Sequence, residues 1–142
     1  MLDKQLTFDE KAQKLTTAAS TDSIDLAVAE VTLGAGIKAV VESIVTTAMT
    51  DSGNDSTMTV TLEEDDNSSF SSPTTVATIG VFAATSAAGT KKSIVIAPDT
   101  VSQRYLRAKY TVANGDLTTG NFTTYIHINT DSYHAYPSGF TA

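Results

Sequence analysis

The sequence predicts an all-β protein, a single jelly-roll-like antiparallel β-sandwich of about eight short strands. Three observations lead to this prediction. Residues 104–112 alternate strictly between inward-facing apolar and outward-facing polar side chains, which is the period of a half-buried strand. Threonine and the other β-branched residues are abundant across the 142 residues, and they favour pleated strands. Turn-forming residues separate several short apolar runs, and no helical spacing is sustained, so a sandwich or jelly roll is favoured.

The region from residue 93 to residue 128 contains the clearest strand signals. Between residues 104 and 112 the inward set is Leu106, Ala108, Tyr110 and Val112. A second alternating run follows at residues 121–128. Asn114-Gly115 lies between the two runs and supplies the positive φ that tight turns require, so the sequence predicts a hairpin here.

Other strands are expected on either side of this region. Residues 38–47 are apolar on both faces near their middle, which is typical of a central strand. Residues 57–62 alternate with Met58, Val60 and Leu62 inward. Further strand candidates are residues 23–27, 72–82 and 93–96. We therefore predict an N-terminal arm over residues 1–22, the sandwich over residues 23–130 and a C-terminal tail over residues 131–142.

Composition restricts the classes of partner. The formal net charge is −7, which argues against nonspecific nucleic-acid binding because such binding depends on Lys and Arg neutralising phosphates. The chain has no cysteine, so disulfides and thiolate metal sites are excluded. No apolar run approaches the roughly 20 residues that span a bilayer, and the polar N-terminus lacks a signal-peptide core. We expect no nucleic-acid or membrane partner, and synthesis and assembly in the cytoplasm.

No active site is predicted, and the expectation is a protein that is not an enzyme and has no cofactor or metal. His127 and His134 are too few and too far apart to form a recognisable motif. Residues 51–55 carry oxygen ligands but lack the spacing of a helix-loop-helix calcium site, which favours an exposed turn. The acidic residues 63–66 are interpreted as a solvated charge run at a strand end.

Three groups of side chains are better suited to binding a partner. Arg104, Arg107 and Lys109 concentrate positive charge on one strand, although they could simply balance nearby Asp and Glu residues. The tail carries Tyr133, Tyr136 and Phe140, which could anchor an interface or fold back onto the sandwich. The arm, with Leu2, Leu6 and Phe8, could add a strand to a neighbour's sheet or fray in solvent.

Short segments along nearly the whole chain, in the same order, resemble the Bbp16-type capsid cement proteins of tailed bacteriophages. The segments are LDKQL at 2–6, STDSIDL at 20–26, LGAG at 33–36, SFSSPTT at 69–75, RYLR at 104–107, YTV at 110–112 and YPSGF at 136–140. The resemblance implies a small jelly-roll protein that decorates the outside of an icosahedral head. It also implies clamping of neighbouring major capsid subunits, usually by an oligomer. No binding residue can be transferred from it.

The expected function is therefore that of a structural virion protein on the outer capsid surface. The expected partners are the major capsid protein and further copies of the chain, most simply as a two-fold dimer, with a trimer as the alternative. A receptor- or carbohydrate-binding β-sandwich module of a phage particle is the rival hypothesis. It would be favoured by exposed aromatic side chains beside carboxylates or by a bound calcium, and Tyr105, Tyr125 and Tyr133 are the aromatic candidates.

Overall fold

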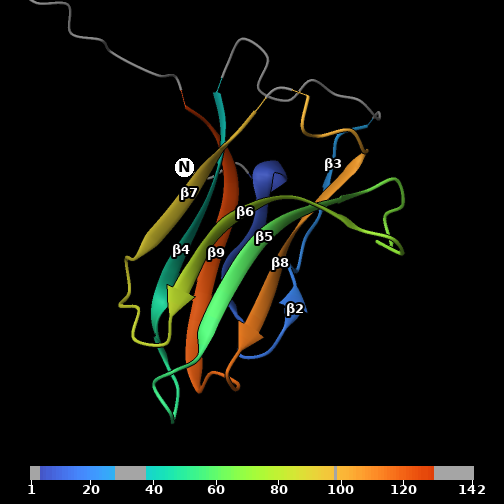
Figure 1. Ribbon diagram of the computed structural model, residues 1–142. Coiled ribbons are helices and arrows are strands. Elements are labelled where there is room, and N and C mark those ends of the chain that lie inside the picture. Colours follow the sequence, from blue (N-terminus) through green and yellow to red (C-terminus); the bar gives the residue numbers. More distant parts are fainter. Residues whose placement is uncertain (1–3, 28–37, 98, 130–142) are drawn as a thin grey trace, which may run out of the picture.

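The computed structural model describes residues 4–27, 38–97 and 99–129, and it confirms an all-β sandwich made of two antiparallel sheets (Figure 1). The strands run along the same long axis, and the two layers face each other. The elements are η1 Lys4–Leu6, β1 Thr7–Gln13, β2 Ala18–Ala19, β3 Ile24–Asp25, β4 Lys38–Thr50, β5 Thr57–Asp65, β6 Thr74–Ala83, β7 Lys91–Ile96, β8 Tyr105–Ala113 and β9 Thr119–Asn129.

The strand order identifies a jelly roll. Sheet A has the order β1-β9-β4-β7, and sheet B has the order β2-β8-β5-β6, with β3 also pairing with β8. If β2 and β3 count as one interrupted strand, consecutive strands lie in opposite sheets except for the β5–β6 hairpin, as in an eight-stranded jelly roll. All the pairs are antiparallel. The predicted fold class is confirmed.

The alternating patterns place their side chains as predicted. Met58, Val60 and Leu62 of β5 are fully buried, and the inward residues of β8 meet them across the sheet. β4 lies between β9 and β7, and its consecutive residues Val40 and Val41 are both buried. This burial on both faces is what the sequence predicted for a central strand.

The predicted hairpin at Asn114-Gly115 is wrong, although the turn itself is present. Both residues have positive φ, 64° at Asn114 and 109° at Gly115. However, β8 pairs with β5 in sheet B, whereas β9 pairs with β1 and β4 in sheet A. The turn carries the chain from one layer to the other, and the buried Leu117 lies on this crossing. Alternation and turn chemistry specify a strand, a turn and a strand, but they do not specify that the two strands pair.

The boundary predicted at residue 22 also differs from the structure. β1 pairs with β9 and β2 pairs with β8, so the sandwich already begins at Thr7. Phe8 is fully buried in the core. The segment was interpreted as an arm because its apolar residues are few, yet β1 is held by its pairing with β9 and by the buried Phe8.

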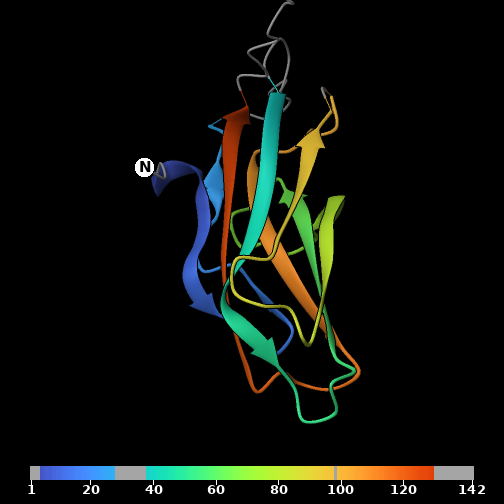
Figure 2. The ribbon, with the colours of Figure 1, turned by 90° about the vertical axis from the view of Figure 1, so that its left-hand side faces the viewer.

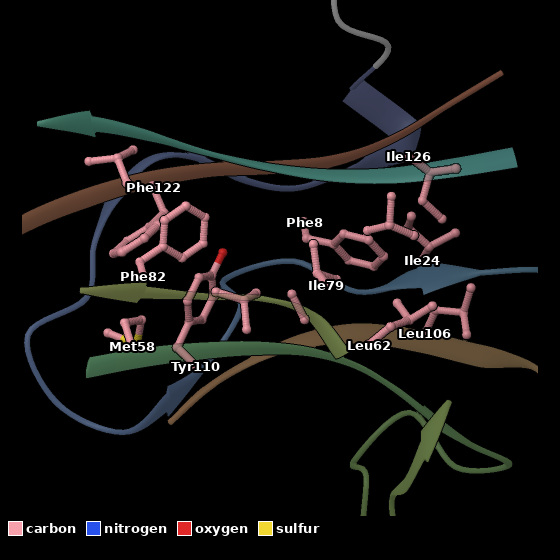
Figure 3. Close-up of a cluster of buried hydrophobic side chains, with 14 of the residues drawn as sticks. Phe8, Ile24, Met58, Leu62, Ile79, Phe82, Leu106, Tyr110, Phe122 and Ile126 are labelled. Carbon is pink, nitrogen blue, oxygen red and sulfur yellow. The ribbon is translucent and has the colours of Figure 1, made fainter. Parts of the chain in front are cut away.

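The core lies between the two sheets (Figure 3). Phe82, Tyr110 and Phe122 form an aromatic group at one end, with ring centroids 5.5 Å apart for Phe82–Phe122 and for Tyr110–Phe122. The Tyr110 hydroxyl points toward the opposite sheet in Figure 3 and donates to Thr124 Oγ1 at 2.7 Å. Thr124 also shares a hydrogen bond with Ser43 at 2.8 Å. Burial raises the pKa of Tyr110 well above its usual range, so this hydroxyl stays protonated.

Among the described residues, no helix has the length and apolar character needed to cross a membrane. The helical element described in this part of the chain is the three-residue turn η1.

Candidate partner-binding surface

β8 brings two of the predicted basic residues, Arg107 and Lys109, to the outer face of sheet B. Its inward residues Leu106, Ala108 and Tyr110 are fully buried, and the residues between them are only partly buried. The β5 register places Arg107 opposite Glu63 and Lys109 opposite Thr61. Arg104 lies just before β8, outside the alternating part of the strand.

Arg104 is bound to a carboxylate of its own chain. Its Nε donates to Asp25 Oδ1 at 2.7 Å, and its Nη2 donates to Asp25 Oδ2 at 2.8 Å. The guanidinium hydrogen bond, aided by the Ala27 backbone N–H, lowers the pKa of Asp25 to about 2. Asp25 belongs to β3, which pairs with the start of β8, so the ion pair ties this short strand to its neighbour.

Arg107 is held even more closely. Its Nε donates to Glu63 Oε2 at 2.8 Å, and its Nη2 lies 2.8 Å from the same oxygen. The guanidinium also lies 4.4 Å from the centroid of the Phe70 ring. Phe70 has a φ of 50°, a backbone conformation that a bulky residue adopts only when its surroundings impose it. Arg107 is therefore a fixed part of the surface.

The outward positive charge is thus smaller than the sequence predicted. Arg104 and Arg107 are neutralised by Asp25 and Glu63, which is the alternative considered for them above. The ammonium group of Lys109 has no ion-pair partner among the described residues.

A shallow pocket of about 210 Å³ opens beside Arg107. The β2–β3 connection lines one side of it, and the loop that follows β5 lines the other. Its walls are rich in hydroxyl groups, and Arg107 and Phe70 belong to its lining. The hydroxyl-bearing residues are Ser20, Thr21, Ser23, Ser68 and Ser69. The pocket is suited to a small polar group, such as a side chain of a docked protein.

The acidic run at residues 63–66 is not a solvated charge run, and this interpretation of the sequence was wrong. Glu64 and Asp65 are 5% and 2% exposed. Glu64 accepts hydrogen bonds from the backbone N–H groups of Ser102 and Gln103 at 2.8 and 3.1 Å. Asp65 accepts from the N–H groups of Asn67 and Ser72 at 2.9 and 2.8 Å. These carboxylates hold the loops before β8 and after β5.

A second polar group lies on the outer face of sheet A. The Tyr125 hydroxyl donates to Glu42 Oε1 at 2.6 Å, and the His127 ring lies 5.7 Å from the Tyr125 ring. Partial burial and the Glu42 carboxylate raise the pKa of Tyr125 to about 12. The sequence named Tyr125 as an aromatic candidate but did not identify Glu42 as its neighbour. The two residues are far apart in the chain and meet only because the β4–β9 register places them opposite each other.

The remaining predicted residues fall into two groups. Leu6 is partly buried against the core and Phe8 is fully buried, so Phe8 cannot anchor a partner while the sandwich is folded. Leu2, Tyr133, Tyr136 and Phe140 lie outside the described residues. Within the described part of the chain, no three His, Cys, Asp or Glu side chains gather as metal ligands would.

Comparison with known families adds one match. The Bbp16 family model matches residues 10–126, which is 117 of the 142 residues. The chain belongs to the Bbp16 family. No curated protein shows a significant match.

The Bbp16 match covers both sheets from within β1 to within β9, including the three basic residues at β8, the pocket and the Tyr125–Glu42 pair. The predicted partner-binding residues of the two termini lie outside the matched span. The matched span of this chain therefore contains the sandwich and its outer faces.

Proposed function

We propose that this Bbp16 protein is a structural virion component, a decoration protein that binds the outer surface of a phage head and links neighbouring major capsid subunits. The observation that carries the proposal is the Bbp16 match across both sheets, together with the resemblance to Bbp16-type capsid cement proteins. On this proposal, its location is the outer capsid surface.

The architecture is suited to such a role. A sandwich with a contiguous core is rigid, and its loops are fixed by buried carboxylates such as Glu64 and Asp65. A rigid body can bridge two subunits without losing much conformational entropy on binding. Contacts of modest strength are sufficient, because repetition around a shell and self-association add their effects through multivalency.

Binding to heads provides the direct test. Heads of the phage that encodes the chain, prepared without it, are mixed with the purified protein and sedimented, and a glycan array is probed in parallel. We expect saturable co-sedimentation with heads and no saturable glycan binding. Saturable binding to glycans, with none to heads, would overturn the proposal in favour of a carbohydrate-binding module. Tyr125 beside Glu42 is the aromatic and carboxylate pair that such a module would use.

The proposed self-association is a separate measurement. A two-fold dimer is the simplest arrangement, with a trimer as the alternative, and sedimentation equilibrium distinguishes them. If the protein is monomeric at all accessible concentrations, the proposed self-association of the free protein is wrong. Binding to heads is then still decided by the co-sedimentation experiment.

A further inference from the structure

The two sheets end in strands whose outer edges differ in their capacity to accept another strand. Sheet A ends in β1 and β7, and sheet B ends in β6 and the interrupted pair β2 and β3. An edge strand presents backbone N–H and C=O groups that have no strand partner, and proteins commonly disrupt such edges to prevent pairing.

Three of these edges are disrupted. The β1–β9 register shifts twice, and Lys11 in β1 has a φ of 52°. β2 and β3 have only two residues each. The β5–β6 register also shifts twice, so that Ile79 and Val76 in β6 have no direct partner. Bulges and short strands of this kind make a poor template for an added strand.

The edge at β7 is regular. All six residues pair with β4 in one continuous register, from Ile96 opposite Ala39 to Lys91 opposite Ile44, with no shift. Among the described residues, no strand pairs with the other side of β7, and β6 of the opposite sheet lies close to one end of it, where Gly80 faces Lys92. Figure 2 shows β7 next to β4 at the margin of its sheet, on the side of the sandwich where β6 also lies. Six residues at roughly 3.3 Å each give a template about 20 Å long.

The side chains along β7 indicate the chemistry of a partner. Val95 is 52% exposed, and with Val81 it is one of two large apolar side chains about half exposed in the described part of the chain. Lys91 and Lys92 are exposed at the start of β7, in a chain of net charge −7. The side chain of Lys91 is 65% exposed, and its distance to Glu42 Oε2 is long, at 3.9 Å.

We propose that β7 accepts an extended strand from the capsid protein to which this chain attaches. The added strand would carry an aliphatic residue near Val95 and Asp or Glu near Lys91 and Lys92. The proposal rests on the proposed function and specifies the contact. Main-chain hydrogen bonds would supply affinity, and these side chains would supply register and selectivity. A second copy of this chain is the less favoured occupant, because both copies carry a net charge of −7 and β7 itself contains no Asp or Glu to meet Lys91 and Lys92.

The chain provides a closely matched control. Val81 on β6 has the same side chain as Val95 and nearly the same exposure, 50% against 52%, but it lies on a bulged edge. Replacing either valine with aspartate should leave the sandwich folded, since both side chains are about half exposed to solvent. We expect Val95→Asp to weaken binding to heads about tenfold or more, because a carboxylate would be buried against the added strand. Val81→Asp and the β-branched variant Val95→Thr should bind within about twofold of wild type.

Amide hydrogen exchange tests strand addition itself. In wild-type protein bound to heads, amides of residues 91–96 should exchange more slowly than in the free protein, while those of residues 7–13, at the opposite edge of the same sheet, should not change. Lys91→Glu together with Lys92→Glu should weaken binding and reduce its dependence on salt.

The outcomes separate this inference from the proposed function. If wild-type protein does not bind heads, the proposed function fails. If wild type binds, but Val95→Asp binds equally well and the β7 amides are not protected, the β7 inference alone fails. Protection of β7 that appears in the free protein as its concentration rises would assign the edge to a second copy and would overturn the capsid-strand inference.

Discussion

Replacing Lys14 with methionine should destabilise the sandwich strongly, because the change leaves a carboxylate buried without its counter-ion. The Asp9 side chain has no exposed surface and that of Lys14 is 8% exposed, with Lys14 Nζ 3.3 Å from Asp9 Oδ1. Lys14 Nζ also donates to the carbonyl of Ala19 at 2.9 Å. Asp9 Oδ1 accepts from the Thr21 backbone N–H at 2.9 Å, whereas Asp9 Oδ2 has no hydrogen-bond partner.

The magnitude follows from this burial. Breaking a buried ion pair by removing one partner costs about 3–5 kcal/mol, because the remaining charge stays desolvated. Methionine retains most of the length of the lysine stem, so a cavity adds little. An exposed pair contributes little to stability because solvent screens it, and Arg104–Asp25, with side chains 43% and 46% exposed, is the internal comparison. With a urea m-value of about 2 kcal/mol/M, Lys14→Met should lower the unfolding midpoint by roughly 2 M.

Urea unfolding followed by far-UV circular dichroism measures this difference. The control variants are Arg104→Met, which should shift the midpoint only slightly, and Asp9→Asn/Lys14→Met, which removes both charges and should recover much of the loss. Equal effects of Lys14→Met and Arg104→Met would refute the argument that burial decides the cost. So would a double variant no more stable than Lys14→Met, since the loss would then not arise from the unpaired carboxylate.

Three further predictions concern other contacts. The Arg104 hydrogen bond lowers the pKa of Asp25 from 3.8 to about 2. The stabilisation that the Asp25 carboxylate gives to the fold is therefore fully present above a pH of about 4 and is lost as the pH falls toward 2. Asp25→Asn should flatten the profile of unfolding free energy against pH in that window. Tyr125 should ionise near pH 12 in a spectrophotometric titration. The stabilisation that its protonated hydroxyl gives to the fold is therefore present below a pH of about 10 and is lost as the pH rises toward 12. Tyr125→Phe should remove this ionisation from the titration. Gly80→Ala should destabilise the fold by about 1–3 kcal/mol in urea unfolding, because the new Cβ would lie 2.6 Å from Lys92 Cβ. Adding Lys92→Gly should relieve this clash, whereas adding Lys92→Ala should not, because alanine keeps the Cβ atom.

The sequence predicted the strands well because alternation is a local property. Each inward residue of β5 and β8 is separated from the next by one outward residue, so six to nine residues are enough to show the pattern. Strand pairing is not local. The connection at Asn114-Gly115 could be a hairpin or a crossing between layers, and its turn residues suit both. The β1 strand was missed because seven residues with one buried phenylalanine carry little periodic signal.

The outer surface was harder to predict, because charge on a sequence does not reveal its partner in space. Arg104 and Asp25 are separated by 79 residues, and Arg107 and Glu63 by 44. Nothing local marks either pair. The loop-anchoring role of Asp65 did leave a signal: an aspartate two residues before Asn67, followed by serines, is typical of a side chain that accepts from the backbone of the turn after it.

The internal pairing of charges narrows how this protein could bind a partner. Because Arg104 and Arg107 each neutralise an acidic residue of their own chain, using either one to bind a foreign carboxylate would first require breaking an ion pair. A partner gains more binding free energy from groups that do not first have to break a strong ion pair within this chain. The unpaired edge of β7 offers backbone groups with no strand partner in the described residues, and of the exposed lysines on it, Lys91 is engaged only in a long ion pair of 3.9 Å with Glu42. Attachment through β7 would therefore leave the ion pairs of sheet B intact, and substitutions that break those pairs should reduce stability more than they reduce binding.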